Sequence, residues 1–565
     1  MMIQQDLGLA VARQLAAWGV QVVFGVIGDD ILPFLDAINR DGKIRYIGAA
    51  HEAGAAFMAS NWAKLSGGLG VCVASAAGAI NLLQGLADAS LDGAPVLGIT
   101  GQAPEAKIGT SIKQYFNHQQ LYAGFSVYSE LITDAPGALR LLIRAMAQAL
   151  TEQKVSHLSF PRNLWSQKVQ AEPGPVPALI KDGERHDIFG DLERSAQLML
   201  NSRYPLLVVG SQGRSAAPEI RQLINHWKAT VVVAQDAKGA VPDDWPEVIG
   251  GIGEGWTPEM VRQADCVLMV GSAGYEEKYL PKVATVQIQE RLSRINDIFL
   301  WDSLVGNIPQ ILDRLTRKLD GYEINLSWWE RMTAAREERI AQRKNDLQNP
   351  AQPVHPARLM AVLSEVASFG ASLCNSTPKD ALLCNSTPKD ALLSDSAPQD
   401  SLAKNIIITS DVGAFMHWFD RDFWATNQRI LLSSVWRSMG NGLPAAIAAQ
   451  IYAPQSKVIA LTGDGGLLMS LGELATVAKY HLPLCIVVVN NGCYGLERDK
   501  ARVQGLNPVG QEIQSPDFRR CVEAFGIRGL RVEDPANLRE SLTEALTATE
   551  PVLVDVHCSD AGLMI

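Results

Sequence analysis

Residues 463–491 read GDGGLLMSLGELATVAKYHLPLCIVVVNN, and they carry the strongest structural signal in the chain. An apolar run at residues 457–461 leads into the glycines, and a second apolar run at 484–489 leads into Asn490 and Asn491. This order predicts two parallel strands joined by a helical segment. Because the carboxyl ends of parallel strands meet at one edge of a sheet, we expect GDGG and the two asparagines to lie together.

The residue types at this edge suit a metal ion and a phosphate group. Asp464 offers a carboxylate and Asn491 an amide carbonyl, and both are hard oxygen donors of the kind that magnesium prefers. The glycines let an anionic group approach the backbone, and a helix beginning near Leu467 would direct its N–H groups toward a phosphate. The alternative is two ordinary turns after buried strands. The joint occurrence of both motifs favours magnesium and an anionic cofactor.

Outward from this stretch, the whole chain alternates helical and strand patterns. In the first third, helices are predicted at residues 7–18, 52–66 and 79–91, and strands at 22–26, 45–48, 70–74 and 95–100. Later in the chain, helices are predicted at 191–201 and 356–369, and strands at 205–210, near 231 and 266, and at 406–409. The pattern predicts an α/β protein with three doubly wound parallel-sheet domains.

Candidate boundaries divide the chain into residues 1–170, 190–325 and 355–565. Residues 170–177 are rich in Pro and Gly and read as a linker, and the charged stretch 315–349 reads as a polar helical connector. Residues 373–402 hold three similar decapeptides, LCNSTPKDAL twice and then LSDSAPQDSL. We interpret them as an insertion in a surface loop, where little packed backbone would be disturbed.

The bulk composition excludes several classes of function. A formal net charge of −10 with no cluster of Lys and Arg argues against a nucleic-acid partner. No apolar run reaches the roughly 20 residues of a membrane helix. The eight cysteines lack metal-binding spacing, and the N-terminus lacks the pattern of a signal peptide, so we expect a cytoplasmic protein with a small-molecule substrate.

Glu52 is the strongest catalytic candidate in the N-terminal part. It starts the segment EAGAAFM, whose small residues indicate tight packing. A carboxylate among such residues is costly to bury unless a partner uses it, and a hydrogen-bonding cofactor would be such a partner.

These motifs together resemble the thiamine diphosphate enzymes, and the resemblance extends over nearly the whole chain. It implies a pyrimidine-binding, a central and a diphosphate-binding domain in that order. In the family, a glutamate bonds the aminopyrimidine ring and favours the tautomer that deprotonates the thiazolium carbon, and Glu52 takes that position. The metal ligands implied are Asp464, Asn491 and the backbone carbonyl of Cys493. The cofactor contacts implied are Glu52, Asn81, Gly413, Ala414, Phe415, Met439, Gly463, Asp464, Gly465, Gly466, Asn491 and Tyr494.

Within this family, the chain is most similar to acetolactate synthases and bacterial pyruvate oxidases. The stretch IGTSIKQYFNHQQLY places Gln114 where those enzymes have an active-site glutamine, although Lys113 replaces the usual Phe. Trp436 replaces a residue that is usually small, and Arg498 or Lys500 is a candidate for binding a substrate carboxylate, with a solvated charged helix as the alternative.

The resemblance implies decarboxylation of a 2-oxo acid, pyruvate in the first instance, with carboligation to a second oxo compound. FAD is possible but not favoured, because the glycine turns of the central domain match flavin-contacting loops only in part. The alternatives are a flavin-dependent pyruvate oxidase, another 2-oxo acid decarboxylase, or a non-catalytic protein that binds the cofactor. In the family the cofactor lies between subunits, so we expect a homodimer or homotetramer.

Overall fold

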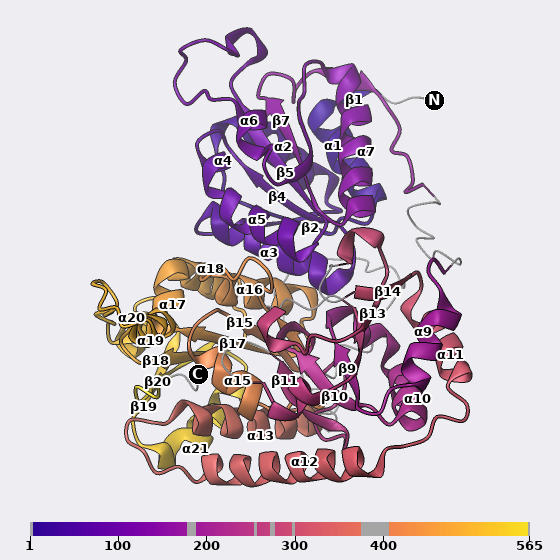
Figure 1. The fold of residues 1–565 in the computed structure, drawn as a ribbon. Helices are drawn as coiled ribbons and strands as arrows, with labels where there is room; N and C mark the ends of the chain where they lie inside the picture. The colour runs from indigo at the N-terminus through magenta and orange to yellow at the C-terminus, as the bar shows by residue number, and fades with distance from the viewer. Residues whose placement is uncertain are drawn as a thin grey trace.

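Three six-stranded parallel sheets, each with its own helices, build the molecule (Figure 1). The computed structural model describes residues 4–177, 188–252, 257–271, 277–295, 300–374 and 406–562. The predicted α/β class with three parallel sheets is therefore confirmed. The decapeptide repeat at 373–402 lies outside the described residues, apart from the first two positions.

The first sheet has the strand order β3-β2-β4-β5-β7-β6. Its strands are β2 (Val22–Gly25), β3 (Arg45–Gly48), β4 (Gly70–Ala74), β5 (Val96–Gln102), β6 (Ser126–Leu131) and β7 (Val155–Pro161). Its helices are α1 (Leu7–Ala17), α2 (Leu32–Asp41), α3 (Glu52–Ser66), α4 (Gly78–Asn81), α5 (Leu83–Asp92), α6 (His118–Tyr122) and α7 (Ala135–Glu152). The single helix predicted at 79–91 is thus two, divided at Leu82. A small antiparallel pair, β1 (Gln4–Asp6) with β8 (Lys168–Gln170), joins the two ends of this part.

The second sheet has the order β11-β10-β9-β12-β13-β14. Its strands are β9 (Pro205–Val209), β10 (Thr230–Ala234), β11 (Val248–Ile252), β12 (Cys266–Val270), β13 (Thr285–Gln289) and β14 (Leu300–Val305), and its helices include α9 (Leu192–Leu200), α10 (Ala217–Trp227) and α11 (Ile308–Lys318). The prediction of one connector at 315–349 was wrong at its start. Leu315 is buried in the core as part of α11, and the connecting helix α12 (Leu326–Leu347) begins only after the cap residue Asn325.

The third sheet, β16-β15-β17-β18-β20-β19, repeats the topology of the first. Its strands are β15 (Ile406–Ser410), β16 (Arg429–Leu431), β17 (Lys457–Gly463), β18 (Leu484–Asn490), β19 (Arg528–Val532) and β20 (Val552–His557). Its helices are α13 (Pro356–Cys374), α15 (Phe415–Asp422), α16 (Gly442–Tyr452), α17 (Asp464–Ser470), α18 (Glu473–Lys479), α19 (Gly495–Val503), α20 (Phe518–Glu523) and α21 (Leu538–Thr547). The helix expected near Leu467 starts three residues earlier, at Asp464 itself.

Alternate strand residues enter different cores, which explains why the strands are apolar throughout. Cys72 and Ala74 of β4 face one apolar cluster, whereas Val71 and Val73 face another. Strands covered by helices on both faces need apolar residues at every position.

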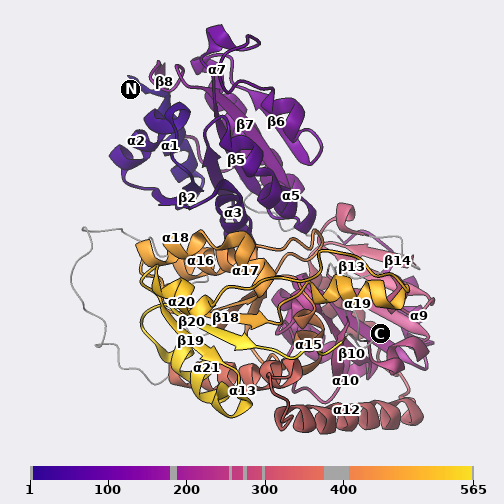
Figure 2. The same ribbon diagram turned by 90° about the vertical axis from the view of Figure 1, so that its left-hand side faces the viewer.

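The first and third parts share one continuous core. The apolar cluster that includes α3 also contains Leu443, Ile447 and other residues of α16. Figures 1 and 2 show the first domain packed against the third, with α3 next to α16. The contact fixes the N-terminal domain relative to the strand ends of the third sheet.

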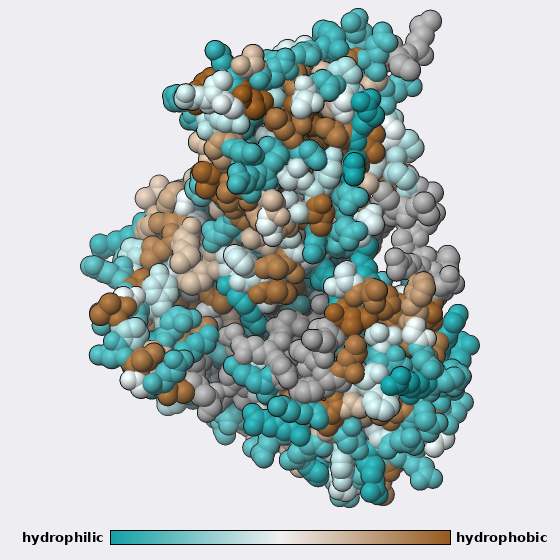
Figure 3. Space-filling model, turned by 45° about the horizontal axis from the view of Figure 1, so that its top comes forward, coloured by the Kyte–Doolittle hydropathy of each residue, from teal (hydrophilic) through white to brown (hydrophobic). Residues whose placement is uncertain are grey.

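The surface is mixed in character. On the face shown in Figure 3, hydrophobic side chains form separate patches among hydrophilic ones. No helix among the described residues has both the length and the apolar character needed to cross a membrane.

Candidate active site

A cavity of about 160 Å³ lies at the carboxyl edge of the third sheet. Here β15 and β17 are neighbours, and the strand order continues from them in opposite directions. Loops that leave such a reversal point diverge and open a crevice. The cavity is lined by Val412, Gly413, Ala414, Phe415, Arg437, Met439, Gly463, Asp464, Gly465, Gly466, Val489, Asn491, Cys493, Tyr494, Gly495, Leu496, Glu497 and Ile513.

Asp464 is the first residue of α17 and is almost fully buried. Its Oδ1 accepts from the N–H of Gly465 at 3.0 Å, and its Oδ2 accepts from the N–H of Gly492 at 2.9 Å and the hydroxyl of Ser515 at 2.7 Å. Burial raises the pKa of this carboxyl, and the hydrogen bonds oppose the rise. Among the described residues, no lysine or arginine forms an ion pair with Asp464. A divalent cation would supply the missing positive charge, so the carboxylate fits a metal ligand.

Asn491 lies directly after β18, whose end is held firmly. The backbone carbonyl of Asn490 accepts from the N–H of Cys558 at 2.8 Å, and the side-chain amide of Asn490 donates to the Asp555 carboxylate at 3.0 Å. Asn491 itself lines the cavity with Asp464. The prediction that the GDGG loop and the end of this strand lie together is therefore confirmed by the geometry.

The backbone carbonyl of Cys493 takes no part in the hydrogen bonds that pair this segment with its neighbour. Cys493 lies opposite Glu512 in an isolated antiparallel β-bridge. Its two backbone hydrogen bonds run from the N–H of Tyr494 to the carbonyl of Gln511 and from the N–H of Ile513 to the carbonyl of Gly492, both at 2.8 Å. In an antiparallel pair of this type, the central residue's own carbonyl points away from its partner strand. The thiol of Cys493 is already an acceptor for Arg498, at 3.1 Å.

Asp411, which the sequence did not single out as a site residue, ties the loops of the cavity together. Its fully buried carboxylate accepts from the N–H of Gly440 at 2.9 Å, the N–H of Val412 at 3.1 Å and the hydroxyl of Thr462 at 3.1 Å. A Cβ on Gly466 would lie 2.1 Å from Asp411 Oδ2, so only glycine fits there. Burial raises the pKa of Asp411 to about 6.

Met439, Tyr494 and Ile513 form an apolar wall against Gly465. A Cβ added to Gly465 would lie 2.9 Å from the Tyr494 ring, 3.0 Å from Ile513 and 3.2 Å from the Met439 methyl. The backbone at Gly465 is therefore reached closely by side chains from three loops. The wall and the glycine loop together leave room for a group with one apolar and one anionic part.

Glu52 begins α3 and pairs with Asn81. The Asn81 amide donates to Glu52 Oε2 at 2.9 Å, and a Cβ on Gly78 would lie 2.3 Å from Glu52 Oε1. The start of α3 is fixed by the buried Glu473 of α18, whose carboxylate accepts from the N–H groups of Ala50 and His51 at 3.2 and 3.1 Å. The structure thus joins Glu52 to Asn81, but neither residue lines the cavity that holds Asp464.

Gln114 also lies apart from the cavity, on the exposed loop that precedes α6. Its φ is +67°, a conformation that residues with side chains rarely adopt. Arg498, in contrast, is buried and paired with Asp499 at 3.0 Å and with Asp560. These partners occupy the guanidinium, which disfavours Arg498 as a ligand for a substrate carboxylate.

Sequence reasoning missed Ser515 and Glu473, and it did not include Asp411 among the predicted cofactor contacts. Asp411 stands directly after an apolar strand, as Asp464 does, and that position was the available signal. Ser515 lies in a segment without a motif, and Glu473 lies between the two halves of the motif at 463–491, so only the fold shows that they reach Asp464 and the start of α3.

Comparison with known proteins matches each of the three parts to a family model. Residues 5–122 match the N-terminal TPP binding domain of thiamine pyrophosphate enzymes, residues 192–315 their central domain, and residues 411–556 their C-terminal TPP binding domain. Thiamine pyrophosphate (TPP) is the same molecule as thiamine diphosphate.

Relatives of similar length match over nearly the whole chain. A Bacillus subtilis (strain 168) protein whose name describes it as thiamine pyrophosphate-containing is 28% identical, over 98% of this chain and 92% of the relative. The acetolactate synthase isozyme 2 large subunit of Escherichia coli (strain K12) is 27% identical, over 97% and 95%. A pyruvate oxidase of Lactiplantibacillus plantarum is 27% identical, over 97% and 88%.

Proposed function

The chain belongs to the thiamine pyrophosphate enzymes, and from this premise we propose that it uses thiamine diphosphate and magnesium to decarboxylate a 2-oxo acid. We further propose that the remaining fragment is joined to a second oxo compound, as in an acetolactate synthase. One observation carries the cofactor part of the proposal. The cavity at the reversal point of the third sheet gathers Asp464, Asn491 and Cys493 beside a glycine loop.

The roles of this chain's residues follow from their chemistry. Asp464, Asn491 and the carbonyl of Cys493 would hold magnesium, and the glycine loop would supply N–H groups for the diphosphate. Met439 and Tyr494 supply the apolar wall. When bound, thiamine diphosphate supplies a carbon nucleophile and takes up the electrons released as carbon dioxide leaves. The carboxyl group of Glu52, which Asn81 orients, would exchange a proton with the bound cofactor.

The separation of Glu52 from the cavity supports a shared site. We propose that each complete site combines the cavity of one chain with Glu52 of a second chain, in a homodimer or homotetramer. Exposed apolar side chains near both regions, Ile80 at 53% and Met469 at 56% exposure, support such an interface. Within this assembly we place Gln114 on the substrate side, since strained backbone concentrates at functional sites.

A flavin-dependent pyruvate oxidase is the second candidate, because one relative is named a pyruvate oxidase. It requires a flavin in the central domain and produces peroxide, whereas the carboligase produces a hydroxy-oxo acid.

We propose a cytoplasmic location, which is supported by the free thiols of the six cysteines that the structure describes in full.

The test is turnover of pyruvate by the purified protein with thiamine diphosphate and magnesium. Carbon dioxide, acetolactate, acetaldehyde and peroxide are assayed together, and the absorption spectrum is recorded for flavin. We expect a colourless protein that releases carbon dioxide with acetolactate as the main product. Acetaldehyde alone would indicate a simple decarboxylase, and peroxide with flavin absorption would indicate the oxidase. Absence of turnover with pyruvate and with other 2-oxo acids would contradict the proposal.

A further inference from the structure

The loop between β16 and α16 supplies two side chains to the candidate cofactor cavity, Arg437 and Met439. Arg437 has a φ of +54°, which is unfavourable for a residue with a side chain. A loop in such a conformation persists only when surrounding contacts hold it. Asp411 of the same domain holds one end of this loop through the N–H of Gly440, and the two other domains supply further contacts.

Residues at both ends of helix α5, in the first domain, form hydrogen bonds to the loop. At the end of α5, the Asp92 carboxylate accepts from the N–H of Ser434 at 2.9 Å and from the N–H of Val435 at 2.7 Å. At the start of α5, the Gln84 amide donates to the hydroxyl of Ser438 at 3.0 Å. A helix of ten residues is about 15 Å long. The two ends of α5 therefore hold the loop at two separate places.

A buried ion pair fixes Asp92 in turn. Lys64 Nζ lies 2.7 Å from Asp92 and 3.0 Å from Asp88, and the two carboxylate side chains are 3% and 0% exposed. Burial alone would lower the pKa of Lys64, but the two carboxylates outweigh it and hold the pKa above its ordinary value. Lys64 also donates to the carbonyl of Leu432, at 3.3 Å. The ammonium group therefore bridges α3, α5 and the loop.

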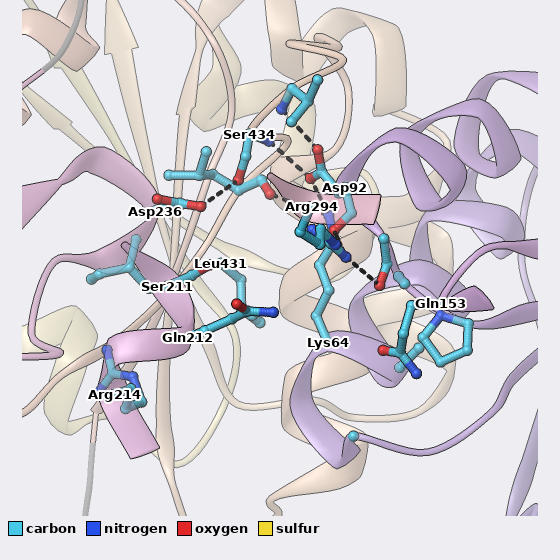
Figure 4. Close-up of a pocket in the computed structure, with 18 of the residues that line it drawn as sticks. Lys64, Asp92, Gln153, Ser211, Gln212, Arg214, Asp236, Arg294, Leu431 and Ser434 are labelled. Carbon is cyan, nitrogen blue, oxygen red and sulfur yellow. Dashed lines mark hydrogen bonds and ion pairs between the residues drawn. The ribbon is translucent and has the colours of Figure 1, made fainter. Parts of the chain in front are cut away.

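The central domain contacts the same loop from the other side. The hydroxyl of Ser434 donates to Asp236 at 3.3 Å, and Arg437 donates to Gln235. Figure 4 shows Lys64, Asp92 and Ser434 turned toward one another, with Asp236 beside Ser434. They lie beside a cavity of about 280 Å³ where all three domains meet.

We propose that Asp92 is a positioning residue that fixes loop 432–440 and thereby places Arg437 and Met439 in the cofactor cavity. The step to cofactor affinity rests on the proposed function. In Asp92→Asn, one of the two acceptor oxygens becomes an NH2 group, so one of the two loop N–H groups loses its acceptor and faces another donor, and Lys64 keeps only Asp88 as a carboxylate partner. The loss of an acceptor and of a charged partner weakens the contacts that hold the loop, so the loop would leave its strained conformation.

The test compares the isosteric variants Asp92→Asn and Asp41→Asn in the full-length protein. Asp41 is the matched control, because its side chain is 5% exposed and pairs with Arg13 at 3.0 Å in the same domain, away from the loop. Hydrogen–deuterium exchange of the peptide 432–441 is measured without cofactor. Calorimetric titration then gives the Kd of thiamine diphosphate in saturating magnesium.

In Asp92→Asn, we expect the N–H groups of Ser434 and Val435, followed in peptide 432–441, to exchange about tenfold faster than in wild type or more. We also expect the Kd of thiamine diphosphate to rise about tenfold. Asp41→Asn should match wild type in both. Unchanged exchange in Asp92→Asn would overturn the inference, and so would faster exchange with a wild-type Kd. Failure of the wild-type protein to bind thiamine diphosphate would instead contradict the proposed function, while the exchange arm still decides whether Asp92 holds the loop.

Discussion

Buried carboxylates near the candidate site are costly to ionise. Asp411 and Asp420 are both almost completely buried, and burial raises their pKa values to about 6 and about 7. Asp420 accepts from Gln235 at 2.6 Å, and the nearby Lys238 opposes the rise. Asp411 shapes the cofactor cavity, whereas Asp420 lies near the far end of α15 and does not line the cavity, although Gln235 links it to the lining residue Arg437.

The pKa of Asp420 predicts a pH-dependent stability. An aspartate in the unfolded chain has a pKa of about 3.9, so Asp420 binds its proton more tightly in the folded chain, where its pKa is about 7. The folded chain therefore loses stability as the pH rises from about 4 to about 7. Asp420→Asn removes this titration. The variant should gain about 1–3 kcal/mol over wild type between pH 5 and pH 8. Denaturant unfolding at both pH values measures the difference, and Asp36→Asn, which removes an exposed carboxylate, is the control. A difference that does not vary with pH would contradict the prediction.

At the scale of the elements, α3 organises the first domain through its small residues. Ala56 of α3 lies against α5, so a Cβ on Gly85 would lie 2.6 Å from the Ala56 methyl and 2.5 Å from the N of Phe57. On another face, α3 packs against α16. This close packing places Glu52 at one end of α3 and Lys64 near the other.

Gly85→Ala is expected to destabilise the fold by about 1–3 kcal/mol, because the added methyl forces α5 away from α3. Gly124→Ala is the matched control, since a Cβ there meets nothing within 4 Å. Thermal and denaturant unfolding of both variants measures the difference. Equal stability of the two variants would show that α3 and α5 have room to adjust.

The sequence predicted the elements best where one pattern ran without interruption. The bounds of α3, β3 and β4 match the expected ones, because alternation of apolar runs and turns marks their ends. The division between α11 and α12 was missed, because the charged residues of α11 hide the buried stripe that includes Leu315. The start of α17 was misplaced because Asp464 serves both as the last loop residue and as the first helical one.

For the candidate site, sequence could predict the residues that follow strands but not those that the fold brings from elsewhere. Asp464 and Asn491 are marked by their strands, and they meet as expected. Ser515 contacts Asp464 from 51 positions away, which no local pattern reveals. The distance between Glu52 and the cavity depends on how whole domains pack, and that was also out of reach.

At the scale of the whole molecule, the proposed sharing of sites between chains makes a quantitative prediction. Glu52→Gln and Asp464→Asn homo-oligomers should each be inactive. Random hybrid dimers of the two variants contain one site with both defects and one intact site. Co-expression should therefore restore up to about a quarter of wild-type carbon dioxide release. No recovery in isolated hybrids would show that Glu52 and Asp464 must belong to the same chain.

The most direct test of the central claim is a calorimetric titration of wild-type protein with thiamine diphosphate, with and without magnesium. We predict saturable binding that requires magnesium, a Kd at least about tenfold higher in Asp464→Asn, and a Kd within about threefold of wild type in Glu52→Gln, which nevertheless releases no carbon dioxide. Binding that is absent in wild type, or equally strong in Asp464→Asn, would contradict the assignment of the cofactor to this cavity.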